Sequence, residues 1–254
     1  MNKSTVEQIR ARFDADVERF SNLETGQSAT VDAPLSLELI AEAAAATTPH
    51  ARDLLDLGCG AGNYSLKLLR ALPGLHVTLL DLSRPMLERA AARVGAATPG
   101  SVRILQGDIR EIDLAPESLD LITAAAVLHH LRGEDEWQAV FTKLYRALRP
   151  GGSLWISDLI AHDSPAVQTV LWRRYGEYLA SLRDPAYRDQ VFAYIEAEDT
   201  PRSLGFQTDL LTATGFAPVE ILHKNLCMAT FGGIKPHSAT GRENAGSSAI
   251  RGAA

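Results

Sequence analysis

The spacing of hydrophobic positions divides the chain into an N-terminal helical part and a longer part in which strand-like and helical segments alternate. Apolar side chains recur at steps of three and four between residues 4 and 20, at Val6, Ile9, Phe13, Val17 and Phe20. This period predicts an amphipathic helix. A polar loop, "LETGQSATVDAP", follows, and a second helix is expected over about residues 35–46.

Beyond Pro49 the pattern changes to short apolar runs separated by helical stretches. The runs that predict strands are "LLDL", "HVTLLD", "VRILQGD", "LDLITAAAV" and "GSLWISDL", the last entered through the breaker "RPGG". The helices expected between them are "SLKLLRAL", "PMLERAAARV" and "DEWQAVFTKLYRAL", the second opened by a serine cap and a proline. This alternation predicts an α/β fold with parallel strands and helices on both faces of the sheet.

Later segments depart from this alternation. Residues 164–214 carry a helical apolar stripe and further helical pattern, which we interpret as an inserted lid over the sheet. "PVEILHKN" and "CMATFGGIK" predict two strands antiparallel to each other, and a small polar tail follows, expected to be disordered. The expected organisation is one domain over 1–236, with an N-terminal helical cap at 1–48, a cofactor-binding core at 50–160, the lid at 164–214, a closing strand pair at 218–235 and the tail at 237–254.

Composition narrows the class of protein. The 254 residues are 46% hydrophobic, enough for a substantial core, and the net charge of −6 is unlike the basic surface of most nucleic-acid binders. Cys59 and Cys227 are expected to be free thiols in a reducing compartment. No signal peptide is recognised and no run approaches the roughly 20 apolar residues of a membrane span, so we expect a cytoplasmic protein that does not enter a membrane.

The stretch "DLLDLGCGAGNYSLKLL" carries the first candidate chemistry. A strand that runs into glycines and then a helix is typical of an anion- or nucleotide-binding turn. The glycines here are Gly58, Gly60 and Gly62, so the spacing is G-x-G-x-G and not the G-x-G-x-x-G of dinucleotide-binding folds. Asp56, two residues before the first glycine, would repel a pyrophosphate and favour a ligand with a cationic centre or an ammonium group.

Two further acidic residues follow predicted strands. Asp81 ends the second strand, where a carboxylate can accept hydrogen bonds from both ribose hydroxyls. Asp108 follows Gly107 at the end of the third strand, where a carboxylate beside an exposed backbone N–H suits the edge of an adenine. A ligand with an amine, a ribose and an adenine but no phosphate is S-adenosylmethionine.

These segments together resemble a known family. "LLDLGCGAGNYSLKLL", "LLDLSRPMLERA", "ILQGDIREI", "LDLITAAAVLHHL" and "YRALRPGGSLWISD", within residues 50–160, are similar to the successive motifs of class I S-adenosylmethionine-dependent methyltransferases. The resemblance implies a Rossmann-like seven-stranded sheet whose last strand is antiparallel, and S-adenosylhomocysteine as product. The expected cofactor-binding residues are Asp56, Gly58, Cys59, Gly60, Gly62, Asp81, Leu82, Met86, Asp108, Ile109 and Ala124. Leu82 and Met86 fit the core equally well, and Cys59 also fits as a small filler.

The second substrate should bind beyond the carboxyl ends of the strands. The fourth strand leads to His129 and His130, and imidazole titrates near neutrality, which suits a general base. The family resemblance instead favours a structural or cofactor-contacting role for one of them, and methyl transfer by proximity needs no base. Candidate acceptor-binding residues in the lid are Trp172, Tyr175, Tyr178 and Arg188; the alternative is a lid helix with an apolar core face and a solvated arginine face. We assign no metal ligands.

A narrower resemblance concerns the two ends of the chain. "RFDADVERF" and "TGFAPVEILHKNLCMATFGGIK" resemble the bacterial carboxy-S-adenosylmethionine synthases, whose product serves in modification of the tRNA wobble uridine. That resemblance implies a lid arginine as partner of a ligand carboxylate, with Arg188 first and Arg174 second, although the spacing departs from the synthase pattern. We interpret the chain as a methyltransferase that acts on a small molecule. The alternatives are a carboxy-S-adenosylmethionine synthase or a related enzyme of tRNA wobble modification, and a non-catalytic cofactor-binding module. A homodimer is also left open.

Overall fold

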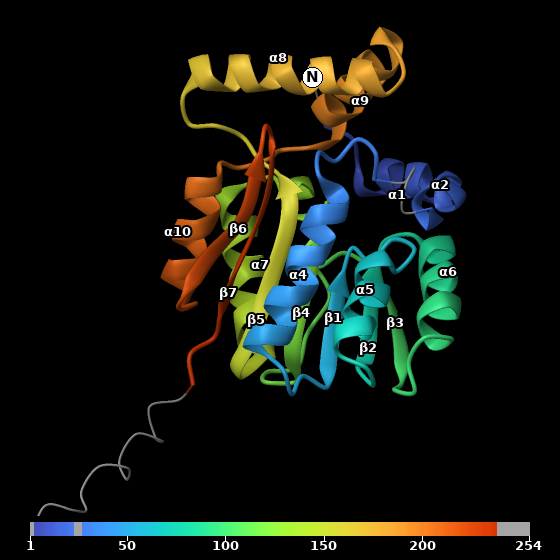
Figure 1. The fold of residues 1–254 in the computed structure, drawn as a ribbon, viewed down its shortest axis with the longest axis vertical. Coiled ribbons are helices and arrows are strands. Elements are labelled where there is room, and N and C mark those ends of the chain that lie inside the picture. The colour runs from blue at the N-terminus through green and yellow to red at the C-terminus, as the bar shows by residue number, and fades with distance from the viewer. Residues whose placement is uncertain (1–2, 23–26, 238–254) are drawn as a thin grey trace, which may run out of the picture.

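The fold is a seven-stranded sheet with helices on both faces (Figure 1). The computed structural model describes residues 3–22 and 27–237, so the tail predicted to be disordered lies, except for His237, outside the described residues. The strands are β1 (Asp53–Leu57), β2 (His76–Asp81), β3 (Val102–Gln106), β4 (Leu119–Ala125), β5 (Leu148–Leu159), β6 (Val219–Asn225) and β7 (Met228–Ile234).

The strand order is β3-β2-β1-β4-β5-β7-β6. The strands β1 to β5 pair in parallel, whereas β7 pairs antiparallel with both β5 and β6. The predicted fold class, with an antiparallel last strand, is confirmed. Because the parallel strands all end at one edge of the sheet, the loops that follow β1, β2, β3 and β4 meet there.

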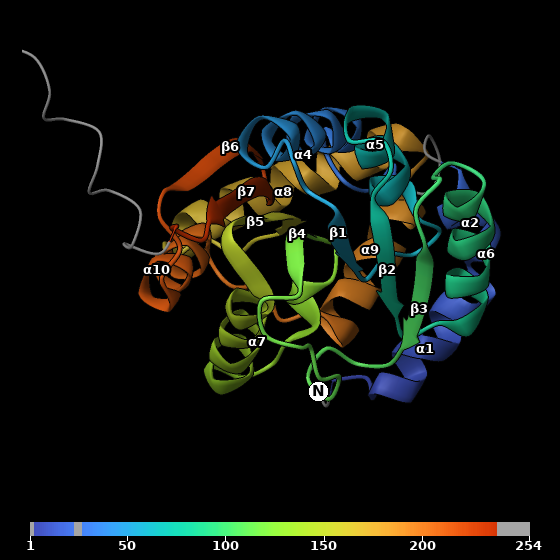
Figure 2. The same cartoon turned by 90° about the horizontal axis from the view of Figure 1, so that it is seen from below.

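The helices in chain order are α1 (Val6–Ala15), α2 (Val17–Ser21), α4 (Ala33–Thr47), α5 (Asn63–Ala71), α6 (Arg84–Gly95), the 3-10 helix η1 (Leu128–His130), α7 (Glu134–Ala147), α8 (Pro165–Leu182), α9 (Pro185–Glu198) and α10 (Leu204–Thr214). Buried side chains of α4, α5 and α6 form one core cluster with one face of the sheet, and those of α7 and α10 form a second with the opposite face. Figure 2 shows these two layers on either side of the strands. None of the described helices has the length and apolarity that a membrane span requires.

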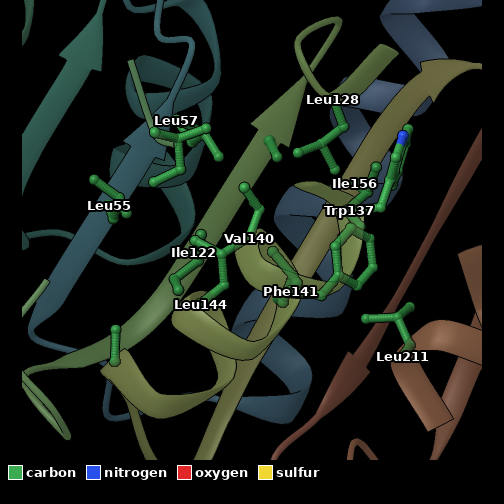
Figure 3. Close-up of a cluster of buried hydrophobic side chains, with 14 of the residues drawn as sticks. Leu55, Leu57, Ile122, Leu128, Trp137, Val140, Phe141, Leu144, Ile156 and Leu211 are labelled. Atoms are coloured by element: carbon green, nitrogen blue, oxygen red, sulfur yellow. The ribbon is translucent and has the colours of Figure 1, made fainter. Parts of the chain in front are cut away.

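The second of these clusters explains why the strands are continuous apolar runs. Trp137, Phe141 and Leu144 of α7 belong to one cluster with Leu55 of β1 and Ile122 of β4 (Figure 3), and all five side chains are fully buried. Each such side chain contributes about 1.5–3 kcal/mol of hydrophobic stabilisation. A strand covered by helices on both faces has few positions left for polar side chains.

Two local boundaries differ from the prediction. The single N-terminal helix is broken at Asp16, which ends α1 and precedes α2, and the break brings the rings of Phe13 and Phe20 to 5.6 Å. The Pro-Gly-Gly breaker lies inside β5, because a register shift in the pairing with β4 takes up the additional residues.

The helices of the segment predicted as a lid pack in two different places. Figure 1 shows α8 and α9 across the end of the sheet at which β5 finishes, and their buried side chains pack on Leu159 of β5 and Met228 of β7. In contrast α10, which the prediction included in the lid, packs against α7, β6 and β7. Its apolar stripe resembles those of α8 and α9, and only the tertiary contacts separate it from them.

Candidate functional site

A pocket lies at the carboxyl ends of β1, β2, β3 and β4. It is lined by the glycine loop after β1, the ends of β2 and β3, and side chains from α1 and α2. Of the expected cofactor-binding residues, those that line it are Gly58, Cys59, Gly60, Asp81, Leu82, Met86, Asp108 and Ile109. We call this the first pocket.

The glycine loop is held open by its own backbone conformation. The N–H groups of Gly58 and Cys59 both donate to the carbonyl of Leu80, at 2.8 and 3.1 Å. Gly58 and Gly60 have φ values of +66° and +49°, which disfavour other residues. A Cβ on Gly60 would meet no atom within 4 Å, so this residue borders the open space of the pocket.

Asp81 is positioned by two backbone groups. Its Oδ2 accepts the N–H of Gly60 and its Oδ1 accepts the N–H of Ser83, both at 2.9 Å. Burial raises the pKa of Asp81, and these two hydrogen bonds oppose the shift. The carboxylate is therefore fixed at the edge of the pocket, and each oxygen keeps a second lone pair for a ligand hydroxyl.

Asp108 lines the pocket but already has a strong partner. Its Oδ2 pairs with Nη2 of Arg110 at 2.5 Å, and its Oδ1 accepts the Nε–H and the backbone N–H of the same residue, both at 2.9 Å. Burial disfavours the charged form, but Arg110 outweighs it and lowers the pKa of Asp108. Arg110 also lines the pocket, and the sequence analysis did not single it out.

The structure does not bring Asp56, Gly62 or Ala124 to the pocket. The carboxylate of Asp56 is buried beneath the loop, where it accepts the hydroxyl and the N–H of Ser65, at 2.6 and 3.2 Å, and the hydroxyl of Thr123 at 3.2 Å. Both oxygens of Asp56 therefore have partners within the protein, and none of the three residues lines the first pocket.

Packing in the interior explains why small residues occupy positions 62 and 124. A Cβ on Gly62 would lie 3.0 Å from Cγ2 of Val94, so glycine here lets α5 approach α6. Ala124 is fully buried within the sheet.

Replacing Asp56 with asparagine should make stability less dependent on pH. Burial raises the pKa of Asp56 from 3.8 to about 6, although Ser65 and Thr123 oppose the shift. A group with a raised pKa stabilises the fold below its unfolded-state pKa and loses that contribution as pH rises through its folded-state pKa. The unfolding free energy of wild type should therefore fall relative to Asp56→Asn between pH 4 and pH 6. Parallel urea titrations of both proteins would refute this if the difference stayed constant.

A second pocket adjoins the first on the side of the lid. It is lined by η1, the end of β5, the C-terminal end of α9 and the two N-terminal helices. The residues that line both pockets are Phe13, Phe20, Thr30, Ala126, His130 and Ser157. A ligand in one pocket and a ligand in the other would thus contact the same side chains.

Each of the two histidines lies beside a buried carboxylate. Nδ1 of His129 hydrogen-bonds Oδ1 of Asp158, and its Nε2 lies 3.6 Å from Oδ1 of Asp199. Nδ1 of His130 lies 3.2 Å from the same oxygen of Asp199, but the atoms are not aligned for a hydrogen bond. Only His130 also reaches the first pocket.

The two imidazoles differ in charge. Burial alone would lower the pKa of His129, but Asp199 and Asp158 outweigh it and raise the pKa to about 9. Burial and the neighbouring His129 lower the pKa of His130. At neutral pH His129 is therefore protonated and unsuited to accept a proton, and His130 is neutral.

Of the lid aromatic residues expected to bind the acceptor, Tyr175 alone lines one of the two pockets. Tyr175 lines the second pocket and donates its hydroxyl to the carbonyl of Ala29 at 2.8 Å. Trp172 stacks on Phe192 at 4.6 Å, and Tyr178 donates to the carbonyl of Ser28 at 2.9 Å. Neither Trp172 nor Tyr178 lines either of the two pockets.

The two lid arginines also lie away from the pockets. The guanidinium of Arg188 pairs with Asp189 at 2.8 Å, and that of Arg174 pairs with Glu177 at 3.0 Å. Their side chains are 37% and 59% exposed, respectively. Neither lines the first or the second pocket, so neither expected carboxylate partner is in place.

Several pocket residues were not predicted. Arg12, Phe13 and Phe20 come from the N-terminal helices, and Asp158 and Asp199 come from β5 and from the C-terminal cap of α9. Phe13 and Phe20 belong to the apolar stripe of residues 4–20. The spacing of such a stripe predicts core side chains and does not indicate a pocket. The others lie too far apart along the chain for spacing to connect them.

Comparisons with known proteins identify relatives of this chain. A family model described as a methyltransferase domain matches residues 54–152. The carboxy-S-adenosyl-L-methionine synthase of Chromohalobacter salexigens is 32% identical over 187 residues, which cover 71% of this chain and 67% of that protein. The protein of the same name from Klebsiella pneumoniae is 31% identical over 126 residues, which are 48% of this chain and half of that protein's length.

A solved structure supports the fold. The crystal structure of human N-acetylserotonin methyltransferase in complex with SAM is similar with a TM-score of 0.59 at 15% identity, over 92% of this chain and 58% of that one. At this identity the likeness concerns the fold alone.

Proposed function

The chain belongs to the class I S-adenosylmethionine-dependent methyltransferases, and on that premise we propose that it methylates a small-molecule acceptor held in the second pocket. The observation that carries the proposal is the junction of the two pockets at Phe13, Phe20, Ala126 and His130. A cofactor in the first pocket and an acceptor in the second would meet at these side chains.

In this proposal the first pocket holds the cofactor through the residues that line it. Asp81 accepts hydrogen bonds from the ribose hydroxyls, and the backbone of Gly58 and Gly60 passes close to the ligand. Leu82 and Met86 form an apolar wall. The cofactor supplies a methyl group already activated by a sulfonium, so the chain's main tasks are alignment and exclusion of water.

The second pocket suits a planar or anionic acceptor. Tyr175 and Tyr194 supply aromatic faces, and the guanidinium of Arg12 lies 5.1 Å from the centre of the Tyr194 ring. Arg19 also lines the pocket, with its guanidinium 4.4 Å from the ring of Phe20. Aromatic rings and cations in one pocket favour flat or negatively charged ligands. Because Arg12 and Arg19 already pair with Glu198 and Asp16, an anionic acceptor would share these cations with them.

The relatives named as carboxy-S-adenosyl-L-methionine synthases support a second candidate, synthesis of a carboxylated cofactor. A ligand carboxylate in a buried pocket needs a cationic partner. Arg188 and Arg174 are exposed and paired with Asp189 and Glu177, so that partner would have to be another residue. We therefore rank ordinary methyl transfer first.

The mass of the ligand that copurifies with the protein separates these candidates. Native mass spectrometry should find S-adenosylmethionine or S-adenosylhomocysteine. A species heavier by a carboxylate in place of a methyl hydrogen would contradict methyl transfer and support the synthase. Tight cofactor binding with no turnover of any planar or anionic acceptor would instead favour a binding module.

A further inference from the structure

We propose that His129, His130 and Asp199 form a binding site for a divalent transition-metal ion in the second pocket. All three side chains line that pocket. One potential ligand atom from each lies within 4.8 Å of the other two. Within residues 3–22 and 27–237, no other group of three or more such side chains comes as close together.

The distances match the edges of a small coordination polyhedron. Oδ1 of Asp199 lies 3.2 Å from Nδ1 of His130 and 3.6 Å from Nε2 of His129. Nitrogen and oxygen ligands bound about 2.1 Å from an ion lie roughly 3.4 Å apart at the tetrahedral angle. Two of the three ligand separations therefore match this geometry, and the third is at most 4.8 Å.

The same atoms lack other partners. Both ring nitrogens of His130 and Oδ1 of Asp199 are buried without a hydrogen bond. The side chain of Asp199 is only 4% exposed. Buried polar atoms are almost always paired, and one ion would provide a partner for Oδ1 of Asp199 and for one ring nitrogen of His130.

His129 is oriented as a metal ligand usually is. Its Nδ1 is held by Asp158, which leaves Nε2 directed toward Asp199. Binding of the ion would displace the proton that Nε2 carries at neutral pH. Asp158 is itself fixed, because its Oδ2 accepts the backbone N–H groups of Leu128 and His129 at 2.8 and 3.2 Å. A carboxylate on the far nitrogen of a histidine is the common second shell of a metal site, and it sets the ring orientation.

The third ligand is held in place by the backbone around it. The backbone N–H of Thr200 donates to the carbonyl of His129 at 2.7 Å, which ties the end of α9 to η1. Asp199 caps the C-terminus of α9, where the helix dipole disfavours a carboxylate. The nearby guanidinium of Arg12 is already engaged by both oxygens of Glu198, at 2.8 and 3.0 Å.

The ligand set indicates which ions would bind. Two imidazole nitrogens and one carboxylate oxygen suit zinc, iron, cobalt or nickel, whereas magnesium and calcium prefer oxygen ligands. Three protein ligands leave positions open toward the pocket. If the proposed function holds, these positions would bind an oxygen or nitrogen of the acceptor and promote its deprotonation. Binding of the ion itself does not depend on that function.

Cobalt titration of the chelator-treated, full-length protein tests the site. We expect one equivalent of Co²⁺ to produce visible absorption, and Zn²⁺, but not excess Mg²⁺, to abolish it. His130→Ala and Asp199→Asn should weaken binding at least ~100-fold, and Asp158→Asn, which replaces the carboxylate that orients His129, by roughly 10- to 100-fold. His223→Ala is the matched control, because His223 pairs with Asp32 at 2.8 Å and does not line either pocket.

Absence of stoichiometric cobalt binding by the wild-type protein would overturn the proposal, as would equal loss of binding in His223→Ala. Calorimetry with S-adenosylhomocysteine on the same samples tests the metal site and the proposed methyl transfer separately. Cofactor binding without metal binding would refute the metal site and leave methyl transfer standing. Metal binding without cofactor binding would support the metal site and refute methyl transfer. Unchanged cofactor affinity in Asp199→Asn would show that this variant folds.

Discussion

Asp81→Ala should weaken S-adenosylhomocysteine binding by roughly 30- to 700-fold, which corresponds to about 2–4 kcal/mol. The Asp81 carboxylate lines the first pocket and accepts the hydrogen bond from the Gly60 N–H. Its loss would remove the expected acceptor of two ribose hydroxyls and also release the glycine loop. Both effects lower affinity, and isothermal titration calorimetry measures their sum.

The matched control for this variant is Asp120→Ala. Asp120 also accepts two backbone N–H groups, from Arg52 and Asp53 at 2.8 and 3.0 Å, but it lies at the start of β4, at the opposite end of the sheet from the pockets. Its removal should lower the melting temperature without changing the dissociation constant. An unchanged dissociation constant in Asp81→Ala would exclude this residue from the site.

Gly60→Ala should raise the dissociation constant for S-adenosylhomocysteine by roughly 5- to 150-fold, because overpacking typically costs about 1–3 kcal/mol. The new Cβ would meet no protein atom within 4 Å, so it would occupy the space of the pocket. The φ of +49° adds strain of about 1–2 kcal/mol to the folded protein whether or not ligand is bound.

Gly74→Ala separates these two effects. Gly74 has a φ of +90° and equally open surroundings, but it lies between α5 and β2 and does not line either pocket. Both variants should lose similar stability in thermal unfolding, and only Gly60→Ala should lose affinity. Equal affinities in the two variants would mean that the ligand does not approach the loop at Gly60.

The parts of the site that lie on consecutive strand ends could be predicted from the sequence. Gly58, Gly60, Asp81 and Asp108 each follow or end a strand, and parallel strands bring their carboxyl ends to one edge. Local patterning is sufficient here because strand and helix periods, capping residues and glycine spacing are all short-range signals. The seven-stranded fold followed from the same signals.

The direction of each side chain depended on packing. Asp56 is adjacent to the loop in sequence, yet its carboxylate points to Ser65 and Thr123 in the interior, because the start of α5 packs over it. Likewise α10 shares its apolar period with α8 and α9 but lies in a different layer. A hydrophobic stripe shows that a helix is buried on one face but does not identify the surface that buries it.

The chain's own sequence thus determined the sheet, the glycine loop and the acidic residues at the strand ends, since these depend on interactions between near neighbours. Only the tertiary structure decided how the second pocket is closed and what lines it. Phe13 reaches it from the N-terminal helices, and Asp199 meets His129 and His130 from the C-terminal cap of α9. Contacts across such separations arise when apolar faces pack together, and no period in the sequence records which faces meet.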